Sequence, residues 1–225
     1  MIKRRSEADP DDLAYRFEVE YPSFQPEADV CLREINALVY GLALDYVVAL
    51  RRSVFNFEAR DHLRERGWNS TQDRLHITFD VYLLTADLIS MAFRVVEYGA
   101  GAAHPMNHTR VLNFLRDPTR LISVDQLSAM GTSFLETLSE YCYSDLLSQL
   151  SQNGMILNEL QVKAGTSPDP ENFRNLVLTR DGAIVFFDPY RVGPYALGRM
   201  KVRMARAVIE PLLPGAIREK YNQAG

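Results

Sequence analysis

The sequence predicts an α+β fold in which antiparallel hairpins pack on one long N-terminal helix and one central helix, in two associated subdomains. Three observations predict it. Apolar residues recur at every second position in several short segments, which is typical of half-buried strands. Apolar steps of three and four fill two longer segments, as in amphipathic helices. Short polar turns join most of the strand-like segments, which favours hairpins over a doubly wound parallel sheet.

The first subdomain is predicted over residues 13–98. Large apolar residues alternate with charged ones in Tyr15–Tyr21, so this segment is expected to be a strand. Pro26 and the acidic residues that follow it are typical of a helix start. The apolar stripe of that helix is expected to continue to Arg66, with Gly67 as the stop.

A hairpin is predicted over residues 74–98, packed on the long helix. The two-residue period is clearest here, and Thr85-Ala86-Asp87 supplies the turn. The run of small residues at 99–103 permits close backbone approach, so we expect a change of direction there. A third extended segment follows at Met106–Phe114.

The second subdomain is predicted over residues 99–215. Its central helix is expected at Ser133–Gln152, where the helical period is kept, and residues 163–172 are expected to be a surface loop. Two apolar runs, Leu176–Thr179 and Ile184–Phe187, flank an Asp-Gly pair and predict a hairpin with a type I′ turn.

The remaining segments are a last strand and the two ends of the chain. Gly198–Met204 is expected to be extended and to lead into a short helix. Residues 1–12 are expected to form a flexible N-terminus and residues 216–225 a tail.

Composition excludes several classes of protein. The 25 Lys and Arg against 29 Asp and Glu give a net charge of −4, which excludes a globally basic nucleic-acid binder. The 47% of hydrophobic residues excludes a disordered chain. With Cys31 and Cys142 alone, a disulfide scaffold is excluded, and the two are either buried thiols or one long-range bridge.

No segment is typical of export or of a membrane span. Acidic residues follow the basic start where a signal peptide needs an apolar stretch. The apolar run Ile35–Leu44 is shorter than the roughly 20 residues that cross a bilayer. The chain as written is therefore expected to be cytoplasmic, or extracytoplasmic if it is the trimmed form of an exported protein.

Local catalytic signatures are absent from the sequence. It has no G-x-S-x-G elbow, no phosphate-binding glycine loop, no H-E-x-x-H and no C-x-x-C. His104 and His108 could bind a metal together with Asp117, but histidines in a polar loop are more often solvated or bonded to backbone. We therefore predict no cofactor and no metal.

The segment 186–198 is the least ordinary in composition, with two prolines and two glycines among its aromatic residues. Such a loop is expected to be rigid and to present Tyr190 and Tyr195. One interpretation is a recognition surface, because tyrosine offers large contact area at low entropic cost. The other is a loop that only locks a crossover between strands.

Basic residues follow at every second position. On a strand, Arg199, Lys201 and Arg203 would project to one side, with Met200, Val202 and Met204 facing inward. This basic stripe could attract an anionic glycan polymer or an acidic partner. It could equally protect a sheet edge from aggregation.

Three segments together resemble the RsiV-type family of bacterial domains: Phe17–Pro22, Gly99–Pro105 and Tyr190–Gly198. That family includes the extracytoplasmic part of lysozyme-sensing anti-sigma factors and the accessory module of some peptidoglycan deacetylases. The resemblance covers about residues 13–215. It implies an α+β fold of two parts, no catalytic residues and a protein ligand such as lysozyme.

The leading hypothesis is therefore a non-catalytic domain that binds a protein, such as a cell-wall hydrolase or an envelope component. Its expected ligand-binding residues are Tyr190, Tyr195, Arg199, Lys201, Arg203 and His104. An inhibitor or immunity-type protein belongs to the same physical class. The alternative is a hydrolase or carbohydrate-active enzyme, with His104, Asp188 and Tyr190 as acid, base and orienting group.

Overall fold

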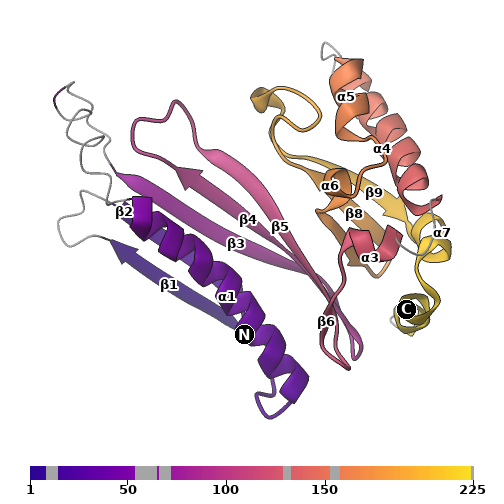
Figure 1. Ribbon diagram of the computed structural model, residues 1–225, viewed down its shortest axis with the longest axis horizontal. Coiled ribbons are helices and arrows are strands. Elements are labelled where there is room, and N and C mark those ends of the chain that lie inside the picture. Colours follow the sequence, from indigo (N-terminus) through magenta and orange to yellow (C-terminus); the bar gives the residue numbers. More distant parts are fainter. Residues whose placement is uncertain (9–14, 54–64, 66–71, 129–132, 153–157, 224–225) are drawn as a thin grey trace. The chain divides into compact units, whose positions relative to one another are not determined.

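A computed structural model describes residues 1–8, 15–53, 65, 72–128, 133–152 and 158–223 (Figure 1). It confirms the α+β prediction, with a six-stranded sheet in the order β1-β2-β3-β4-β5-β6 and a three-stranded sheet in the order β7-β8-β9. The strands are β1 Ile2–Ala8, β2 Tyr15–Pro22, β3 Asp73–Leu84, β4 Leu88–Tyr98, β5 Met106–Leu115, β6 Arg120–Leu121, β7 Leu176–Thr179, β8 Gly182–Phe187 and β9 Met200–Ala205.

The helices differ widely in length, and α1 and α4 are the longest of those described. Their bounds are α1 Val30–Ser53, α3 Val124–Ser128, α4 Ser133–Gln152, α5 Glu159–Gly165, α6 Pro170–Phe173, α7 Arg206–Ile209 and α8 Gly215–Asn222. Short 3₁₀ turns occur at Tyr195–Leu197 and Glu210–Leu212.

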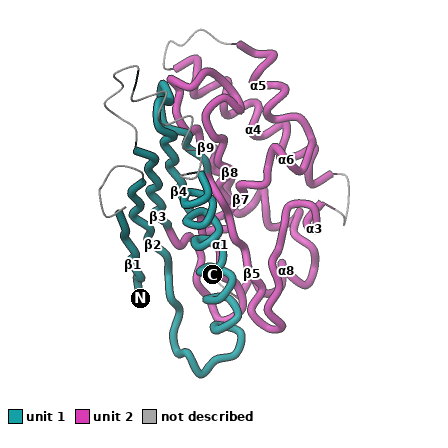
Figure 2. Tube along the Cα trace, turned by 60° about the vertical axis from the view of Figure 1, so that its left-hand side comes forward, with its two compact units in different colours: residues 1–79, 93–108 teal, residues 80–92, 109–225 magenta. Residues whose placement is uncertain are grey.

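The chain forms two compact units (Figure 2). Unit 1 holds residues 1–79 and 93–108, and unit 2 holds residues 80–92 and 109–225. The expected boundary at residue 98 differs from this division, because β3, β4 and β5 each contribute residues to both units.

Unit 1 contains a parallel strand pair, whereas the sequence predicted strands joined mainly as antiparallel hairpins. β1 pairs antiparallel with β2, but β2 pairs parallel with β3, from Tyr15 opposite Asp73 to Val19 opposite Ile77. Parallel neighbours need a long crossover connection. Here the connecting segment contains α1, which packs against β2.

Helix α1 begins later than the predicted start at Pro26. The Asp29 carboxylate accepts a hydrogen bond from the backbone N–H of Leu32 (3.0 Å), so Asp29 caps the helix and Val30 is its first residue. The predicted continuation to Arg66 and the stop at Gly67 lie outside the described residues.

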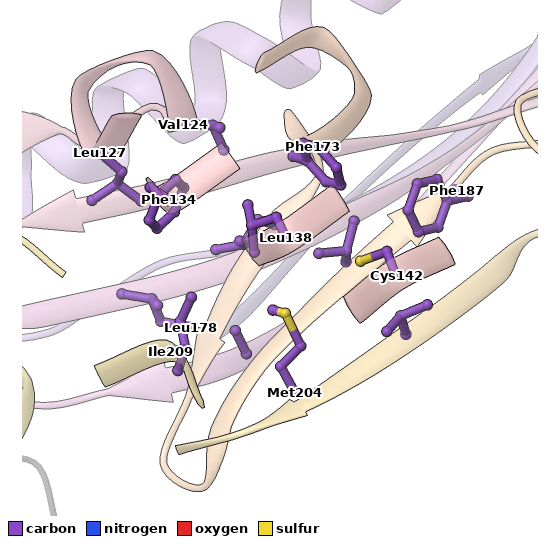
Figure 3. Packing of buried hydrophobic residues seen from close by; sticks show 14 of the residues in the cluster. Val124, Leu127, Phe134, Leu138, Cys142, Phe173, Leu178, Phe187, Met204 and Ile209 are labelled. Carbon is purple, nitrogen blue, oxygen red and sulfur yellow. The ribbon is translucent and has the colours of Figure 1, made fainter. Parts of the chain in front are cut away.

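The core of unit 2 rests on the predicted central helix, which the structure confirms at Ser133–Gln152. Its buried residues recur at every fourth position and pack against one face of the small sheet (Figure 3). They are Phe134, Leu138, Cys142, Leu146 and Leu150. The opposite face of that sheet packs through Val177, Ile184 and Phe186. Every residue of β8 is therefore buried.

The hairpin β7–β8 is confirmed, with Thr179 opposite Gly182, but the type I′ turn is wrong. That turn requires positive φ at both central residues. Among the described residues, Tyr190 is the only non-glycine with positive φ, so Arg180 and Asp181 do not meet this requirement. Gly182 has φ +148°, and a Cβ there would lie 1.9 Å from the carbonyl oxygen of Met204.

The expected surface loop at 163–172 is wrong at both ends, because α5 continues to Gly165 and α6 begins at Pro170. Asn158 caps α5 by accepting from the N–H of Gln161 (3.2 Å). Asp169 caps α6 by accepting from the N–H of Glu171 (2.9 Å). Asn172 donates to the carbonyl oxygens of Ala164 and Ser167, which holds the two helices together.

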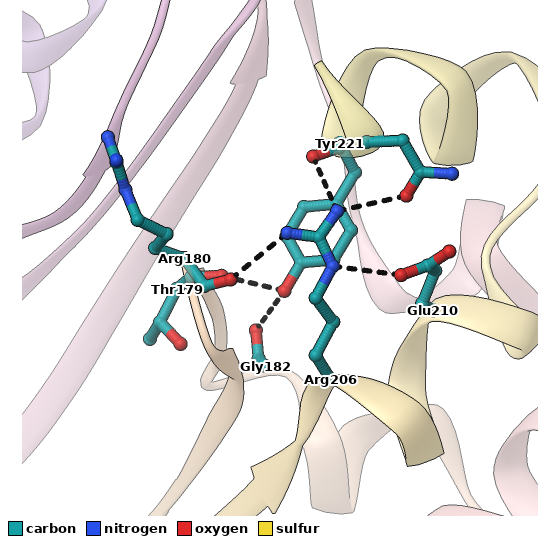
Figure 4. A network of polar contacts seen from close by, with 7 residues as sticks. Thr179, Arg180, Gly182, Arg206, Glu210 and Tyr221 are labelled. Carbon is teal, nitrogen blue, oxygen red and sulfur yellow. Dashed lines mark hydrogen bonds and ion pairs between the residues drawn. The ribbon is translucent and has the colours of Figure 1, made fainter. Parts of the chain in front are cut away.

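Neither chain end matches its prediction. Residues 2–8 form β1 rather than a flexible segment. Residues 215–222 form α8 rather than a tail, and Tyr221 is fully buried. The Tyr221 hydroxyl lies 2.7 and 2.9 Å from the carbonyl oxygens of Thr179 and Gly182, and Arg206 covers its ring (Figure 4).

Both cysteines are free thiols, so the long-range bridge between Cys31 and Cys142 is not formed in the structure. Cys142 is buried, and burial raises the pKa of its thiol. Within the part of the chain that the structure describes, no helix is long and apolar enough to cross a membrane.

Candidate functional site: the tyrosine loop and the basic stripe

The tyrosine loop, residues 188–198, opens with a tight turn after β8. The backbone N–H of Arg191 donates to the carbonyl oxygen of Asp188 (3.1 Å), with Pro189 second and Tyr190 third in the turn. Tyr190 has φ +70°, as the third residue of a type II turn requires. Glycine usually occupies this position, since the left-handed region costs other residues about 1–2 kcal/mol. The Tyr190 side chain is half exposed at 51%.

The start of the loop is anchored by the Asp188 carboxylate. It accepts hydrogen bonds from the N–H and the hydroxyl of Thr109, at 3.1 and 2.7 Å, and from the amide of Asn175 at 3.2 Å. The side-chain amide of Gln161 donates to the carbonyl oxygen of Tyr190 (2.9 Å). Contacts from β5, from α5 and from the turn before β7 therefore fix the position of the turn.

The second half of the loop brings Tyr195 to Tyr190. The N–H of Leu197 donates to the carbonyl oxygen of Pro194 (3.0 Å), and the N–H of Gly198 to that of Tyr195 (2.9 Å). The two tyrosine rings lie 5.6 Å apart between centroids, tilted by 40°. The loop thus presents an aromatic pair on an ordered backbone.

A small cavity of about 240 Å³ lies between α6 and the loop. Asn175, Asp188 and Tyr190 contribute to its lining. Arg191 also lines the cavity and donates to the carbonyl oxygen of Glu171 (2.8 Å).

The predicted alternation along β9 is confirmed. Arg199, Lys201 and Arg203 are exposed, whereas Val202 and Met204 are buried against α4. The strand is an edge of its sheet, because β8 is its only neighbour among the strands that the structure describes. The basic stripe therefore faces solvent.

Side chains of α4 already cover part of this sheet edge. The Gln149 amide donates to the carbonyl oxygen of Lys201 (3.0 Å), and the Tyr141 hydroxyl donates to that of Arg203 (3.2 Å). An edge whose outward carbonyls are occupied is a poor template for another strand. Protection of the edge therefore depends less on the basic stripe than the sequence alone implies.

Two aromatic rings lie beside Arg199, the first cation of the basic stripe. The Arg199 guanidinium lies 4.7 Å from the centroid of the Phe186 ring, which is a cation–π distance. The Tyr82 ring lies 5.7 Å from the same ring. Burial and then the charge of Asp80 raise the pKa of Tyr82, while Arg199 and Arg203 oppose that rise. Arg199 therefore packs over a ring that is itself buried, with the partly exposed Tyr82 ring beside it.

His104 lies in unit 1, whereas the other five predicted binding residues lie in unit 2. Its Nδ1 is 3.1 Å from the carbonyl oxygen of Pro105. His108 contacts the Tyr46 hydroxyl through Nε2 (2.9 Å). No cluster of three or more His, Cys, Asp or Glu among the described residues is arranged to hold a metal ion.

Sequence reasoning missed Thr109, Asn175 and Gln161, which position the tyrosine loop. Thr109 is 79 residues from Asp188 along the chain, so no local pattern links the two. The available signal was that Thr109 and Asn175 are polar residues within or next to apolar strands. Both are almost fully buried, and a buried polar group needs a hydrogen-bond partner.

Comparison with known proteins gives one family match. Residues 125–207 match the model of a family described as a protein of unknown function, DUF3298. Two solved structures of DUF3298 family proteins share the fold. One, from Bacteroides fragilis, aligns with 99% of this chain and 96% of its own at a TM-score of 0.63 and 17% identity. The other, from Pseudomonas aeruginosa, aligns with 96% of this chain and 97% of its own at a TM-score of 0.59 and 13% identity.

The curated relatives are longer proteins, and this chain aligns with only part of each. The peptidoglycan-N-acetylmuramic acid deacetylase PdaC of Bacillus subtilis is 19% identical over 90% of this chain and 40% of its own length. Immunogenic protein MPT64 of Mycobacterium tuberculosis is 26% identical over 52% of this chain and 49% of its own. An esterase of the same organism is 26% identical over 50% of this chain and 47% of its own length. The chain thus spans half or less of the curated relatives it matches.

Proposed function

We propose that this chain is a non-catalytic binding domain whose ligand is a protein with an acidic surface, such as a cell-wall hydrolase or another envelope component. The observation that carries the proposal is the Tyr190–Tyr195 pair, held on an anchored loop that runs directly into the basic stripe.

The chemistry of this surface suits protein recognition. Tyrosine offers a large apolar face with a polar tip, and an ordered loop loses little further entropy on binding. The Arg199, Lys201 and Arg203 charges would steer an acidic partner toward the aromatic pair. An acidic catalytic cleft, such as that of lysozyme, is electrostatically complementary to this surface.

The relatives support an envelope setting. The name of the Bacillus subtilis relative gives peptidoglycan as its substrate. The RsiV-type resemblance implies a protein ligand, in agreement with the surface described above. An inhibitor or immunity-type protein would use the same kind of contact.

A hydrolase is the second candidate, favoured by the esterase relative. It requires Asp188 to act as a base toward a substrate. In the structure both Asp188 oxygens accept hydrogen bonds from Thr109 or Asn175, which is the arrangement of an anchoring carboxylate. Turnover of an ester or glycan that disappears in both Asp188→Asn and His104→Ala would establish the enzyme instead.

The binding proposal is tested with immobilised chain and a panel of lysozyme-type hydrolases. We expect Arg199→Glu combined with Lys201→Glu to weaken capture at least tenfold. The matched control is Arg120→Glu with Arg218→Glu, which makes the same charge change at exposed cations of unit 2 outside β9. Binding by the wild type should also weaken with salt. Equal capture by both double variants would overturn the role of the basic stripe.

A further inference from the structure

A groove of about 880 Å³ lies on the sheet of unit 1, far larger than the cavity beside Tyr190. Its volume lies within the range of about 300–1,000 Å³ that is usual for ligand sites. β2, β3, β4 and the turn before β5 contribute to it. The side chains that matter for recognition are Arg16, Glu18, Arg74, His76, Tyr98 and Pro105.

The register of β2 and β3 places two arginines directly opposite each other in this groove. Arg16 is the partner of Arg74, and Glu18 is the partner of His76 two residues further along the same face. All four side chains are exposed. Like charges opposite each other in a sheet repel and cost stability. An anion placed between the two guanidinium groups would remove that repulsion.

The neighbours of the arginine pair use few of its hydrogen-bond donors. Arg16 lies 3.5 Å from the Glu18 carboxylate, and both side chains are 56% exposed, so that ion pair is weak. Arg74 donates through Nε to the side-chain oxygen of Gln72 (3.1 Å). Since each guanidinium carries five donors, the contacts with described residues leave most of them to a ligand.

We propose that this groove binds an oligosaccharide that bears carboxylates, with one carboxylate between Arg16 and Arg74 and a sugar ring against Tyr98. Guanidinium groups pair with carboxylates through short, charge-assisted hydrogen bonds. The sugar hydroxyls match the polar groups of Glu18 and His76. Tyr98 and Pro105 offer apolar surface to the C–H faces of the ring.

Recognition through side chains favours a sugar over a peptide. A peptide adds to a sheet by pairing with the backbone of an exposed edge. β2 pairs with β1 on one side and β3 on the other, so its backbone groups are already engaged. A ligand over this groove therefore meets side chains, and a sugar chain carries polar groups all along its length.

This inference rests on unit 1 alone, and the proposed protein site rests on unit 2. Loss of one would leave the other intact. Variants of Arg16 and Arg74 should not alter capture of a hydrolase by the basic stripe.

The test is calorimetric titration of the whole chain with oligogalacturonate and with its methyl ester, which keeps the rings and removes the charges. We expect the ester to bind at least tenfold more weakly. Arg16→Gln combined with Arg74→Gln should weaken oligogalacturonate binding at least tenfold. The control, Arg33→Gln combined with Arg52→Gln on α1, removes the same charge from exposed positions of unit 1 and should bind as the wild type does.

Three results would overturn the proposal. The first is absence of oligogalacturonate binding, and the second is equal binding by the double variant and its control. The third is an oligoglutamate peptide of the same charge binding as tightly as the sugar. A separate measurement guards against unfolding: Arg74→Gln alone should leave the melting temperature unchanged or raise it, because it relieves repulsion. A clear fall would show that the arginine pair is structural.

Discussion

Two substitutions of Tyr190 separate the cost of its strained backbone from the contribution of its ring. Both Tyr190→Gly and Tyr190→Ala remove the ring and its contact with Tyr195, which is worth about 0.5–1.5 kcal/mol. They differ in the backbone. Alanine keeps the cost of φ +70°, about 1–2 kcal/mol, whereas glycine relieves it. Glycine in turn gives the unfolded chain more freedom, which costs about 0.4–1 kcal/mol.

The balance favours glycine by about 1 kcal/mol. Tyr190→Gly should thus be close to the wild type in stability, while Tyr190→Ala should be about 1 kcal/mol less stable. In most other positions glycine is the less stable of the two. A chain of this size should show the difference as roughly 2–4 °C in melting temperature.

Urea unfolding of the two variants and the wild type measures this directly, provided that the slopes agree. If the alanine variant proved as stable as the glycine variant, or more so, the strain argument would be refuted. The role of the turn in presenting the aromatic pair would then lack its physical basis.

Two further variants probe the candidate site and its support, and a third probes the stability of unit 1. Gly165→Ala would place a Cβ 2.2 Å from the carbonyl oxygen of Arg191, so it should displace the loop and weaken partner capture while both tyrosines remain, as binding assays would show. Leu146→Ala should lower the free energy of unfolding by about 2–5 kcal/mol in urea titrations, because this fully buried residue lies in the core beneath β9. The Arg51 guanidinium lowers the pKa of Glu7 below its ordinary value of 4.5, so Glu7→Gln should cost stability above that pH. The difference from wild type should vanish as pH falls through the folded-state pKa in a pH series of melting curves.

Local patterns predicted the elements whose stabilising contacts are close in sequence. The strand Leu88–Tyr98 and the helix Ser133–Gln152 match their predictions, because the turn at Thr85-Ala86-Asp87 marks the start of the strand and apolar residues at every fourth position mark the helix. Strand β1 was missed because its sequence is mostly polar. Its stability comes from pairing with β2 and from contacts such as that of Glu7 with Tyr15 (2.6 Å).

The candidate sites divide in the same way. Local composition indicated the tyrosine loop, and basic residues at every second position indicated the basic stripe. The anchoring of Asp188 by Thr109 and the opposition of Arg16 to Arg74 depend on residues more than fifty positions apart, and the second also needs the parallel pairing of β2 with β3. Hydrophobic periodicity carries no information about such pairings, which tertiary structure alone determines.

The central claim is that the tyrosine loop binds an acidic protein surface. The most direct measurement is the dissociation constant of a lysozyme-type hydrolase for the wild type and for Tyr190→Gly, the variant expected to keep its fold. We predict at least tenfold weaker binding by the variant at unchanged stability. Equal affinity of the two proteins would contradict the claim.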